Sequence, residues 1–431
     1  MKKQKVLVAM SGGVDSSVAA LLMKKQGYEV IGAFMKNWSD TKNDFGECTW
    51  RGERRMALRV AAMLKIPLIT LDFEKEYRKL VVEEMYKKYR QGITPNPDID
   101  CNDKVKFPLL IRAMRKLKCD FLVTGHYARI KKSVIRNKLD NKNNSKVNNK
   151  YANVNESISG FDGSNKYTYK LLRAKDEMKD QSYFLYKLKQ KELACVQFPI
   201  GEYKKEEVRE IARRNKFPNY KKKSTVGICF IGKVNLKKFL QKKIKPRPGI
   251  IIDPLGNVIG EHDGIFYYTI GQRIGPRFGI EVAKNEKQQK KWYIARKNAK
   301  KNVLVAAPEG HELNFREEIY ANDIHWISKG LVNELKNNIK NVNNSKSRLL
   351  ISNGKYASVS EPISEWARGN KPVKVFSRIR QVGELLSSII SFKNNKIKVT
   401  LRKPITGVSE GQAIVLYRGK EVLGGGVIGF S

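Results

Sequence analysis

The sequence predicts an α/β protein with an N-terminal doubly wound parallel-sheet domain, a small, mostly β central domain and a C-terminal β-barrel. In the first half of the chain, apolar runs of strand length alternate with segments of helical periodicity, as in parallel sheets covered by helices. From residue 249 onward, short apolar strands follow one another between turn residues, as in small barrels. The 431 residues, 41% of them hydrophobic, suffice for two or three domains with cores of their own.

The N-terminal domain is expected over residues 1–222, where strand-like and helix-like segments alternate. The predicted strands lie at residues 5–10, 29–34, 67–71 and 120–124. The predicted helices lie at residues 17–27, 48–64, 77–91, 107–116, 179–201 and 204–214. A proline-containing loop is expected at residues 94–102.

The other two domains are expected over residues 223–307, with Cys229 near the start, and residues 308–431. Two segments rich in Asn and Lys, at about 131–167 and at 336–346, lack periodicity and apolar mass. Such composition predicts a disordered or hairpin-tip insert in the first domain and an interruption of the barrel.

The charge balance indicates an acidic partner. Lys and Arg number 85 against 42 Asp and Glu, a formal net charge of +43, and such an excess attracts polyanions, including nucleic acid. An A/T-rich genome, which inflates Lys and Asn, explains part of the excess. No apolar run is long enough to span a membrane, and the first strand begins at once, so no membrane partner and a cytoplasmic location are expected.

Cysteine usage predicts free thiols and no metal ligands. The five cysteines are widely spaced without a CxxC pair, and the chain has only four histidines. This is not the spacing of a zinc site, and an odd count in a cytosolic chain does not indicate a disulfide framework.

The segment Ser11–Ser17 (SGGVDSS) joins the first strand to the first helix. Two glycines let the backbone approach a ligand, and hydroxyls with free N–H groups at a helix start favour an anion. The segment lacks the Gly-Lys-Ser/Thr of a Walker A loop, and an ordinary serine-capped turn is the alternative. Met35 and the pair Gly125-His126 stand at the ends of other strands, where open α/β sheets bind ligands.

The SGGVDSS segment resembles the PP-loop of ATP pyrophosphatases, which cleave ATP between the α- and β-phosphates. The resemblance implies that an acceptor is adenylated, but it does not identify the acceptor.

Two cysteines indicate which chemistry could follow adenylation. Cys101 lies in the proline-stiffened loop three residues after Asp98, a carboxyl group that can move a proton. Cys229 follows three lysines, and nearby positive charge favours the thiolate. Either cysteine alone would read as a small buried hydrophobic residue. Together with a PP-loop, they predict sulfur chemistry at an adenylated oxygen.

Nearly the whole chain outside the two inserts resembles the bacterial tRNA-specific 2-thiouridylases. The shared segments occur in the family's order: VAMSGGVDSSVAALL, TPNPDIDCN, VKF, TGHYAR, KDQSYFL, FPIG, GICFIG, HDGIFYYTIGQR, KWYIARK, GQAIVLY and LGGGVI. The resemblance implies ATP- and Mg²⁺-dependent 2-thiolation of the wobble uridine in the tRNAs for Lys, Glu and Gln. It also implies a persulfide sulfur donor or carrier protein as a partner, and a monomer is the expected state.

The resemblance also implies roles for individual residues. ATP would be bound by Ala9, Met10, Ser11, Gly12, Gly13, Val14, Asp15, Ser16, Met35 and Gly125. In catalysis, Cys101 would be a nucleophile able to form a disulfide with Cys229, Cys229 would carry the persulfide, and Asp98 would be the acid/base. The target base and the rest of the tRNA would be contacted by Asn96, Pro97, Asp98, His126, Lys179, Asp180, Gln181, Arg378, Ile379 and Gln412.

Some positions depart from the family's pattern, and two other functions stay open. Ile379 replaces an aromatic residue, and residues 223–226 lack the acidic residue usual before Cys229. One alternative is another PP-loop adenylating enzyme, a ligase or a lysidine-type tRNA synthetase, whose chemistry does not need two cysteines. The other is a non-catalytic basic RNA-binding protein, against which the complete SGGVDSS loop argues. An iron–sulfur cluster is an alternative to the persulfide route.

Overall fold

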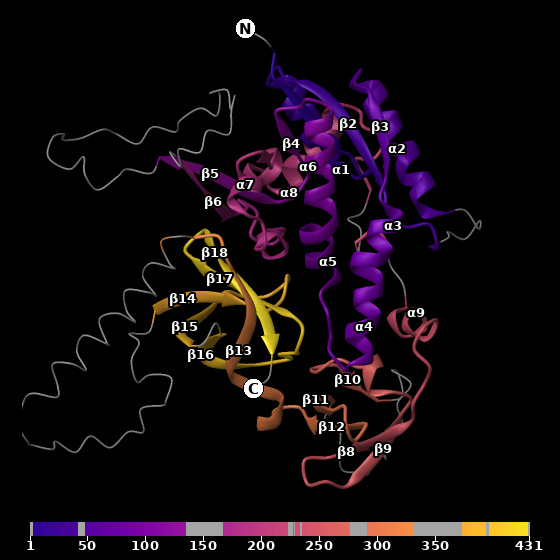
Figure 1. Cartoon of the computed structure of the whole chain (residues 1–431), viewed down its shortest axis with the longest axis vertical. Helices are drawn as coiled ribbons and strands as arrows, with labels where there is room; N and C mark the ends of the chain where they lie inside the picture. Colours follow the sequence, from indigo (N-terminus) through magenta and orange to yellow (C-terminus); the bar gives the residue numbers. More distant parts are fainter. Residues whose placement is uncertain are drawn as a thin grey trace, which may run out of the picture.

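The structure is a computed structural model that describes residues 3–41, 48–134, 167–222, 227, 229–232, 235–275, 291–328, 330, 373–393 and 396–429. Most of the first predicted insert, all of the second and the altered segment at 223–226 lie outside these residues. Three sheets organise the described chain, with the α/β part, the central β part and the barrel side by side (Figure 1).

The N-terminal sheet is parallel and has the strand order β3-β2-β1-β4-β7. Its strands are β1 (Lys5–Ala9), β2 (Glu29–Lys36), β3 (Leu68–Asp72), β4 (Phe121–Val123) and β7 (Val196–Gln197). Helices α1 (Val14–Lys25), α2 (Thr49–Met63) and α8 (Lys205–Arg214) pack on one face, and α6 (Phe107–Lys116) packs on the other. The predicted doubly wound sheet is therefore confirmed.

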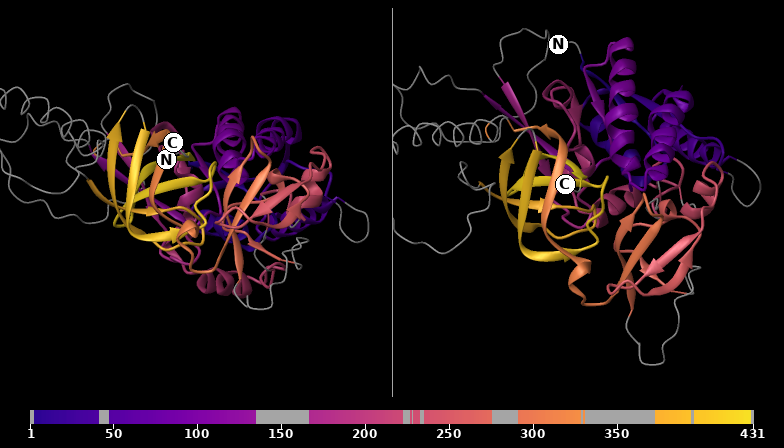
Figure 2. Two further views of the ribbon diagram at one scale, coloured as in Figure 1. Left: turned by 90° about the horizontal axis from the view of Figure 1, so that it is seen from below. Right: turned by 60° about the horizontal axis from the view of Figure 1, so that its bottom comes forward.

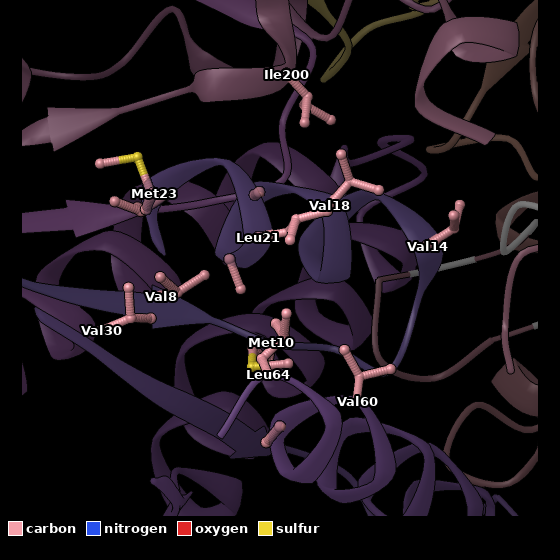
Figure 3. Packing of buried hydrophobic residues seen from close by; sticks show 14 of the residues in the cluster. Val8, Met10, Val14, Val18, Leu21, Met23, Val30, Val60, Leu64 and Ile200 are labelled. Atoms are coloured by element: carbon pink, nitrogen blue, oxygen red, sulfur yellow. The ribbon is translucent and has the colours of Figure 1, made fainter. Parts of the chain in front are cut away.

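Figure 3 shows the core on the face of the sheet that α1 covers. Val8 of β1 and Val30 of β2 pack with Val18 of α1 and Val60 of α2, all at most 4% exposed. Continuous apolar strands of this kind are needed because a parallel sheet is buried on both faces. The core fixes the start of α1, and so the SGGVDSS segment, against the end of β1.

The predicted loop at 94–102 is wrong beyond residue 96. The chain is helical from α5 (Pro97–Asp100) through a π-helical segment, η2 (Cys101–Lys106), into α6. Asn96 caps this segment by accepting a hydrogen bond from the Ile99 N–H at 3.3 Å, and proline at the first helical position is compatible with a helix. The predicted helix at 77–91 is likewise divided into α3 (Glu74–Tyr77), the π-helical η1 (Arg78–Glu83) and α4 (Glu84–Arg90).

The long helix predicted at 179–201 is also wrong. The structure has four short elements there: η4 (Ser182–Leu185), α7 (Gln190–Leu193), the edge strand β7 and η5 (Pro199–Glu202). Val196 pairs with Leu122 of β4. Short apolar runs fit a strand as well as a helix, and the open edge of β4 decides between them.

The central β part is a five-stranded sheet in the order β10-β11-β12-β8-β9. Its strands are β8 (Gly249–Ile252), β9 (Val258–His262), β10 (Arg273–Ile274), β11 (Trp292–Asn298) and β12 (Val303–Pro308). The short helices α9 (Leu236–Gln241), η6 (Ile265–Tyr267) and η8 (Glu312–Asn314) accompany it. Ile251 of this sheet packs in one apolar cluster with Cys101 and Val105 of η2, so the sheet supports the helix that carries Cys101.

The C-terminal part is a closed barrel, because β13 pairs with both β16 and β18. Its described strands are β13 (Phe315–Trp326), β14 (Val373–Arg378), β15 (Leu386–Lys393), β16 (Lys396–Thr406), β17 (Ala413–Arg418) and β18 (Glu421–Gly429). Figure 2 shows the barrel next to the central sheet. The predicted barrel is confirmed.

A hairpin of the N-terminal part joins the barrel sheet. It consists of β5 (Ala128–Val134) and β6 (Tyr167–Arg173), and Leu172 pairs with Glu421 of β18. The first four residues of the predicted insert, 131–134, and its last, 167, are therefore strand. Within the described chain, no helix combines the length and the apolar character that crossing a membrane requires.

Candidate active site

The two cysteines predicted to react lie together. The Sγ atoms of Cys101 and Cys229 are 3.8 Å apart, although 128 positions separate them in the sequence. Cys101 is fully buried, and Cys229 is half-buried. The Cys229 N–H donates a hydrogen bond to Asp98 Oδ1 at 2.8 Å, and its carbonyl accepts one from the Tyr77 hydroxyl. Both backbone groups of Cys229 are thus held, which fixes its sulfur against Cys101.

Lys106, not among the site residues expected from the sequence, completes this cluster. Its Nζ lies 3.8 Å from Cys229 Sγ and 5.4 Å from the centre of the Phe230 ring. Lys106 ends the π-helical segment that begins at Cys101. Because π-helical hydrogen bonds span five residues, positions five apart lie closer to one face than in an α-helix. The π-helical geometry therefore lets both Cys101 and Lys106 reach Cys229.

The surroundings shift the pKa values of the two thiols in opposite directions. The pKa of Cys229 is lowered, first because the Cys101 thiol donates a hydrogen bond to its sulfur and then because Lys106 is positively charged. The pKa of Cys101 is raised well above its ordinary value by burial and by its neighbour Cys229. Cys229 is therefore the better thiolate, and Cys101 holds its proton.

Asp98 is placed to act as a proton carrier. Burial raises the pKa of its carboxyl group, while the bond from the Cys229 N–H and the charge of Lys106 oppose that rise. A carboxyl group with a raised pKa can bind and release a proton closer to neutral pH than an exposed one.

His126 lies behind Lys106 and is buried. Its Nε2 is 3.5 Å from Lys106 Nζ, and its Nδ1 is 2.7 Å from Thr124 Oγ1. The ring stacks on Phe107 at a centroid distance of 5.8 Å. Burial, together with the charge of Lys106, lowers the pKa of His126 well below its ordinary value, so the ring is neutral.

The SGGVDSS segment forms an ordered loop at the start of α1. Gly12 has a φ of +75°, and the Ser11 N–H donates a hydrogen bond to Ser16 Oγ at 3.1 Å. The Ser16 hydroxyl donates to the Gly13 carbonyl at 3.1 Å. Asn219 Nδ2 donates to the Gly12 carbonyl at 3.1 Å and to Ser17 Oγ at 2.9 Å. These bonds give the loop a defined shape.

Two lysines lie at this loop, each bound to a carboxylate. Lys205 Nζ is 2.6 Å from Asp15 Oδ1, which also accepts a hydrogen bond from the Tyr127 hydroxyl at 2.9 Å. Lys222 forms an ion pair with Glu53, and its Nζ also lies 3.4 Å from the Gly12 carbonyl oxygen. The other residues expected to bind ATP gather at the same sheet edge: Ala9 and Met10 at the end of β1, Met35 in β2 and Val14 in α1.

The dipeptide Gly125-His126 connects the loop to the thiols. A Cβ atom on Gly125 would lie 2.7 Å from the Ser16 nitrogen, so the backbone after β4 touches the start of α1. His126 contacts Lys106, which contacts Cys229. The predicted phosphate site and the predicted sulfur site are therefore two halves of one region.

Two residues expected to meet tRNA join the barrel to the segment that precedes α5. The Gln412 side chain donates hydrogen bonds to the carbonyls of Thr94 and Pro95 at 3.0 and 2.9 Å. Asn96 Nδ2 donates to Gln412 Oε1 at 3.4 Å. Asn96 and Pro97 are half-buried at the start of α5.

The structure does not bring the remaining expected tRNA contacts onto one exposed surface. Asp180 and Arg378 are 1% and 4% exposed and form an ion pair at 2.9 Å between Oδ2 and Nη1. Ile379 packs in the barrel core, and Gln181 Oε1 accepts a hydrogen bond from the Tyr127 N–H at 2.9 Å. Lys179 is exposed.

Comparison with known proteins identifies the family. A Nitrosomonas europaea protein named tRNA-specific 2-thiouridylase MnmA is 36% identical over 429 residues, covering 99% of each chain. Proteins of the same name from Buchnera aphidicola and Coxiella burnetii are 37% and 36% identical over 99% of this chain and 97% and 96% of their own. This chain belongs to the tRNA-specific 2-thiouridylase family.

Three family models divide this 2-thiouridylase-family chain in the order of its three sheets. A tRNA methyl transferase HUP domain matches residues 4–233, a tRNA methyl transferase PRC-barrel domain matches 237–308, and an aminomethyltransferase beta-barrel domain matches 346–428. Cys229 falls in the first match. A solved NMN synthetase from Francisella tularensis covers 28% of this chain and 44% of its own at 18% identity and a TM-score of 0.21, a likeness too small to support an argument.

Proposed function

We propose that this protein catalyses the ATP-dependent 2-thiolation of the wobble uridine of tRNA. The supporting observation is the thiol pair, 3.8 Å apart and with pKa values shifted in opposite directions, in the same region as the ordered SGGVDSS loop. A ligase or a lysidine-type synthetase has no use for such a pair. A non-catalytic RNA-binding protein does not require the ordered loop at α1 either. The relatives' names specify tRNA and 2-thiouridine.

The first step is activation of the base. The uridine leaves its stack, because its C2 oxygen is not reachable inside the folded anticodon loop. The C2 oxygen attacks the α-phosphorus of ATP, an O–P bond forms, and pyrophosphate leaves. Residues Ser11–Ser16 would hold the pyrophosphate through backbone N–H groups and hydroxyls at the N-terminus of α1. Lys205 and Lys222, already at the loop, would supply positive charge.

The second step transfers sulfur. Cys229, loaded as a persulfide by a donor or carrier protein, attacks C2 with its outer sulfur; a C–S bond forms, and AMP leaves with the C2 oxygen. The Cys101 thiolate then attacks Cys229 Sγ, and the bond between Sγ and the outer sulfur breaks. That sulfur stays on the base as 2-thiouridine, reduced by two electrons, while the two cysteines are oxidised to a disulfide. Asp98 would take the proton from Cys101, and an external thiol reductant would restore both thiols.

The residues around the loop do not fit a Mg²⁺ site. The described carboxylates beside it, Asp15 and Glu53, are each bonded to a lysine, so neither is a free oxygen ligand for a hard cation. Mg²⁺ would be held chiefly by the phosphate oxygens of ATP and by water.

Binding of tRNA would use the excess of positive charge. A formal charge of +43 is suited to many phosphate contacts, and exposed Lys179, close to the barrel interface, is one candidate. Phosphate contacts position a nucleic acid without reading its sequence. The tRNAs for Lys, Glu and Gln, and a monomeric enzyme, remain our expectation from the resemblance.

The decisive experiment follows 2-thiouridine formation by mass spectrometry in unmodified tRNA for lysine, with ATP, Mg²⁺ and a persulfide donor. We expect product with the wild-type chain, none with Cys229→Ala, and unchanged product with Cys119→Ala, a buried cysteine of another cluster. Pyrophosphate release should persist in Cys229→Ala. Cys101→Ala should accumulate a protein–tRNA adduct that dithiothreitol converts to thiolated tRNA. Full thiolation by Cys229→Ala, or none by the wild type, would contradict the proposal.

A further inference from the structure

We propose that Lys106, oriented by Thr124 and His126, is the cation that holds the Cys229 sulfur as an anion during sulfur transfer. Lys106 touches the reacting sulfur, and His126 is a positioning residue that acts through Lys106. This inference rests on the proposed function, because it takes Cys229 as the sulfur carrier.

Among the described contacts of Lys106, the Cys229 sulfur is the nearest atom that can carry a negative charge. Its ammonium lies 3.8 Å from that sulfur, 3.5 Å from His126 Nε2 and above the Phe230 ring. Within the described chain, no carboxylate forms an ion pair with Lys106, and the Asp98 charge acts on it only at longer range. Burial alone would lower the pKa of Lys106, but Cys229, Cys101 and Asp98 outweigh it and raise the pKa. Lys106 is therefore protonated beside the thiol.

The hydrogen-bond pattern fixes the role of His126. An ammonium group has only donors, so Nε2 of His126 must accept the hydrogen bond from Lys106. The ring proton is then on Nδ1, where it donates to Thr124 Oγ1 at 2.7 Å. With Phe107 and Phe198 packed against it, the ring is a neutral, fixed acceptor that aims Lys106 at Cys229.

The groups that face Cys229 show why one lysine matters. The Cys101 thiol donates to the sulfur, and the Asp98 carboxyl opposes the thiolate. Tyr77 bonds the carbonyl of Cys229 and not its sulfur, and His126 is neutral. Among the described residues that face the Cys229 sulfur, Lys106 is thus the one that carries a positive charge. Without it, the proton affinity of Cys229 should rise, and so should that of the persulfide sulfur bound to it.

The test uses the full-length protein and measures alkylation of Cys229 by iodoacetamide against pH, with the Cys229 peptide followed by mass spectrometry. We expect Lys106→Met to shift the alkylation midpoint upward by about one pH unit, which lowers reactivity at neutral pH about tenfold. Thiolation should fall by a similar factor, while pyrophosphate release stays unchanged. Lys106→Arg should keep most of the alkylation reactivity at neutral pH and most of the thiolation. Lys104→Met, with the same charge change on the same helical segment and its ion pair to Asp100, should alkylate as the wild type does.

Each outcome separates the two proposals. An unchanged alkylation midpoint in Lys106→Met overturns the inference, even if the wild type thiolates tRNA. A shifted midpoint without wild-type thiolation supports the cation role and overturns only the proposed function. A raised KM for ATP with an unchanged midpoint assigns Lys106 to the nucleotide. If Lys106→Met loses thermal stability, Lys106→Gln, which keeps a donor toward His126, replaces it. His126→Leu should give a smaller shift in the same direction, as a positioning residue would.

Discussion

At Gly125 the backbone that follows β4 passes so close to α1 that a side chain has no room. A Cβ atom there would stand 2.7 Å from the Ser16 nitrogen and 2.8 Å from the Asp15 carbonyl carbon. Both are backbone atoms of the first turn of α1, which cannot move aside as a flexible side chain can. This glycine is therefore required for the close approach of the backbone after β4 to the SGGVDSS segment, apart from any contact with ATP.

Gly125→Ala should consequently destabilise the protein and displace the loop. Overpacking of this kind costs about 1–3 kcal/mol, and a shifted Ser16 should weaken ATP binding. Thermal denaturation and ATP titration measure the two effects. Gly52→Ala is the matched control, because Gly52 is exposed in helix α2 with nothing within 4 Å of its Cβ position, and alanine there should stabilise by about 0.5–1 kcal/mol. Equal effects of the two substitutions would contradict the steric argument.

At the scale of single elements, local signals predicted what local interactions decide. The strand–loop–helix at the N-terminus follows from apolar runs and glycines that are adjacent in sequence, and helix α6 has the bounds expected, 107–116. Local sequence patterns predict the sulfur chemistry of the two cysteines but not their contact, because 128 positions separate them. The family resemblance, and not periodicity, indicated that both belong to one site.

The sequence could not indicate the elements that packing decides. Counted along an α-helix, Lys106 would point about 140° away from Cys101, and only the π-helical segment η2 turns both toward Cys229. That segment is stabilised by contacts with Tyr77 and Ile251 of other elements. Strand β7 likewise forms because the edge of β4 is open. Lys106 was visible in the sequence as part of the VKF segment, but no periodicity of an ordinary helix pointed to the site.

Lys297 connects strand β11 to the segments that follow α4 and η6, and it should make the stability of the protein depend on pH. It lies in β11, and its ammonium donates to the carbonyls of Gly92 and Tyr268, each at 2.7 Å. Burial lowers its pKa from 10.5 to about 8, against a weak opposing effect of Glu410. Below pH 8 the lysine is charged in both the folded and the unfolded states. Between pH 8 and 10.5 the folded state loses the proton first, so stability gained through this residue rises with pH.

The expected gain across that window is about 3 kcal/mol. It is measured as the free energy of unfolding of the wild type minus that of Lys297→Met, from denaturant titrations at pH 7.5 and pH 10. The difference should move in favour of the wild type as the pH rises. For Lys300→Met, an exposed neighbour, it should stay constant. If the stability difference depended on pH in the same way for both variants, folding would not lower the pKa of Lys297, and the prediction would be wrong.

At the scale of the whole molecule, the three parts share their cores. One apolar cluster runs from Leu7 of β1 to Ala413 and Tyr417 of the barrel, and another joins Cys101 to the central sheet. Gln412 adds a polar link from the barrel to the segment before α5. The barrel is therefore joined by packed groups to the helical segment that carries Asp98 and Cys101.

Variants of the buried pair Asp180–Arg378 can distinguish a role at the interface between the barrel and the α/β part from a direct contact with tRNA. Their side chains are 0% and 5% exposed, and Asp180 also accepts hydrogen bonds from the Ser182 hydroxyl and the Ala174 N–H. Replacing Asp180 by Asn leaves the Arg378 guanidinium buried without a counter-charge and removes one of the two carboxylates paired with Arg173, which costs about 3–5 kcal/mol. Adding Arg378→Met removes that charge and should recover part of the loss.

We therefore expect Asp180→Asn to lower the melting temperature and loosen the barrel from the α/β part, detectable as faster limited proteolysis between them. The affinity for tRNA should fall only as far as the folded fraction falls, and the double variant should regain part of both the stability and the affinity. Glu177→Gln, which alters an exposed partner of Arg173 but leaves the pairing of Arg173 with Asp180 in place, should leave both unchanged. If Asp180 instead contacts tRNA directly, Asp180→Asn would change affinity at an unaltered melting temperature, and Arg378→Met would not rescue it. Because both residues are buried where the barrel meets the α/β part, the first pattern is the one that this fold requires.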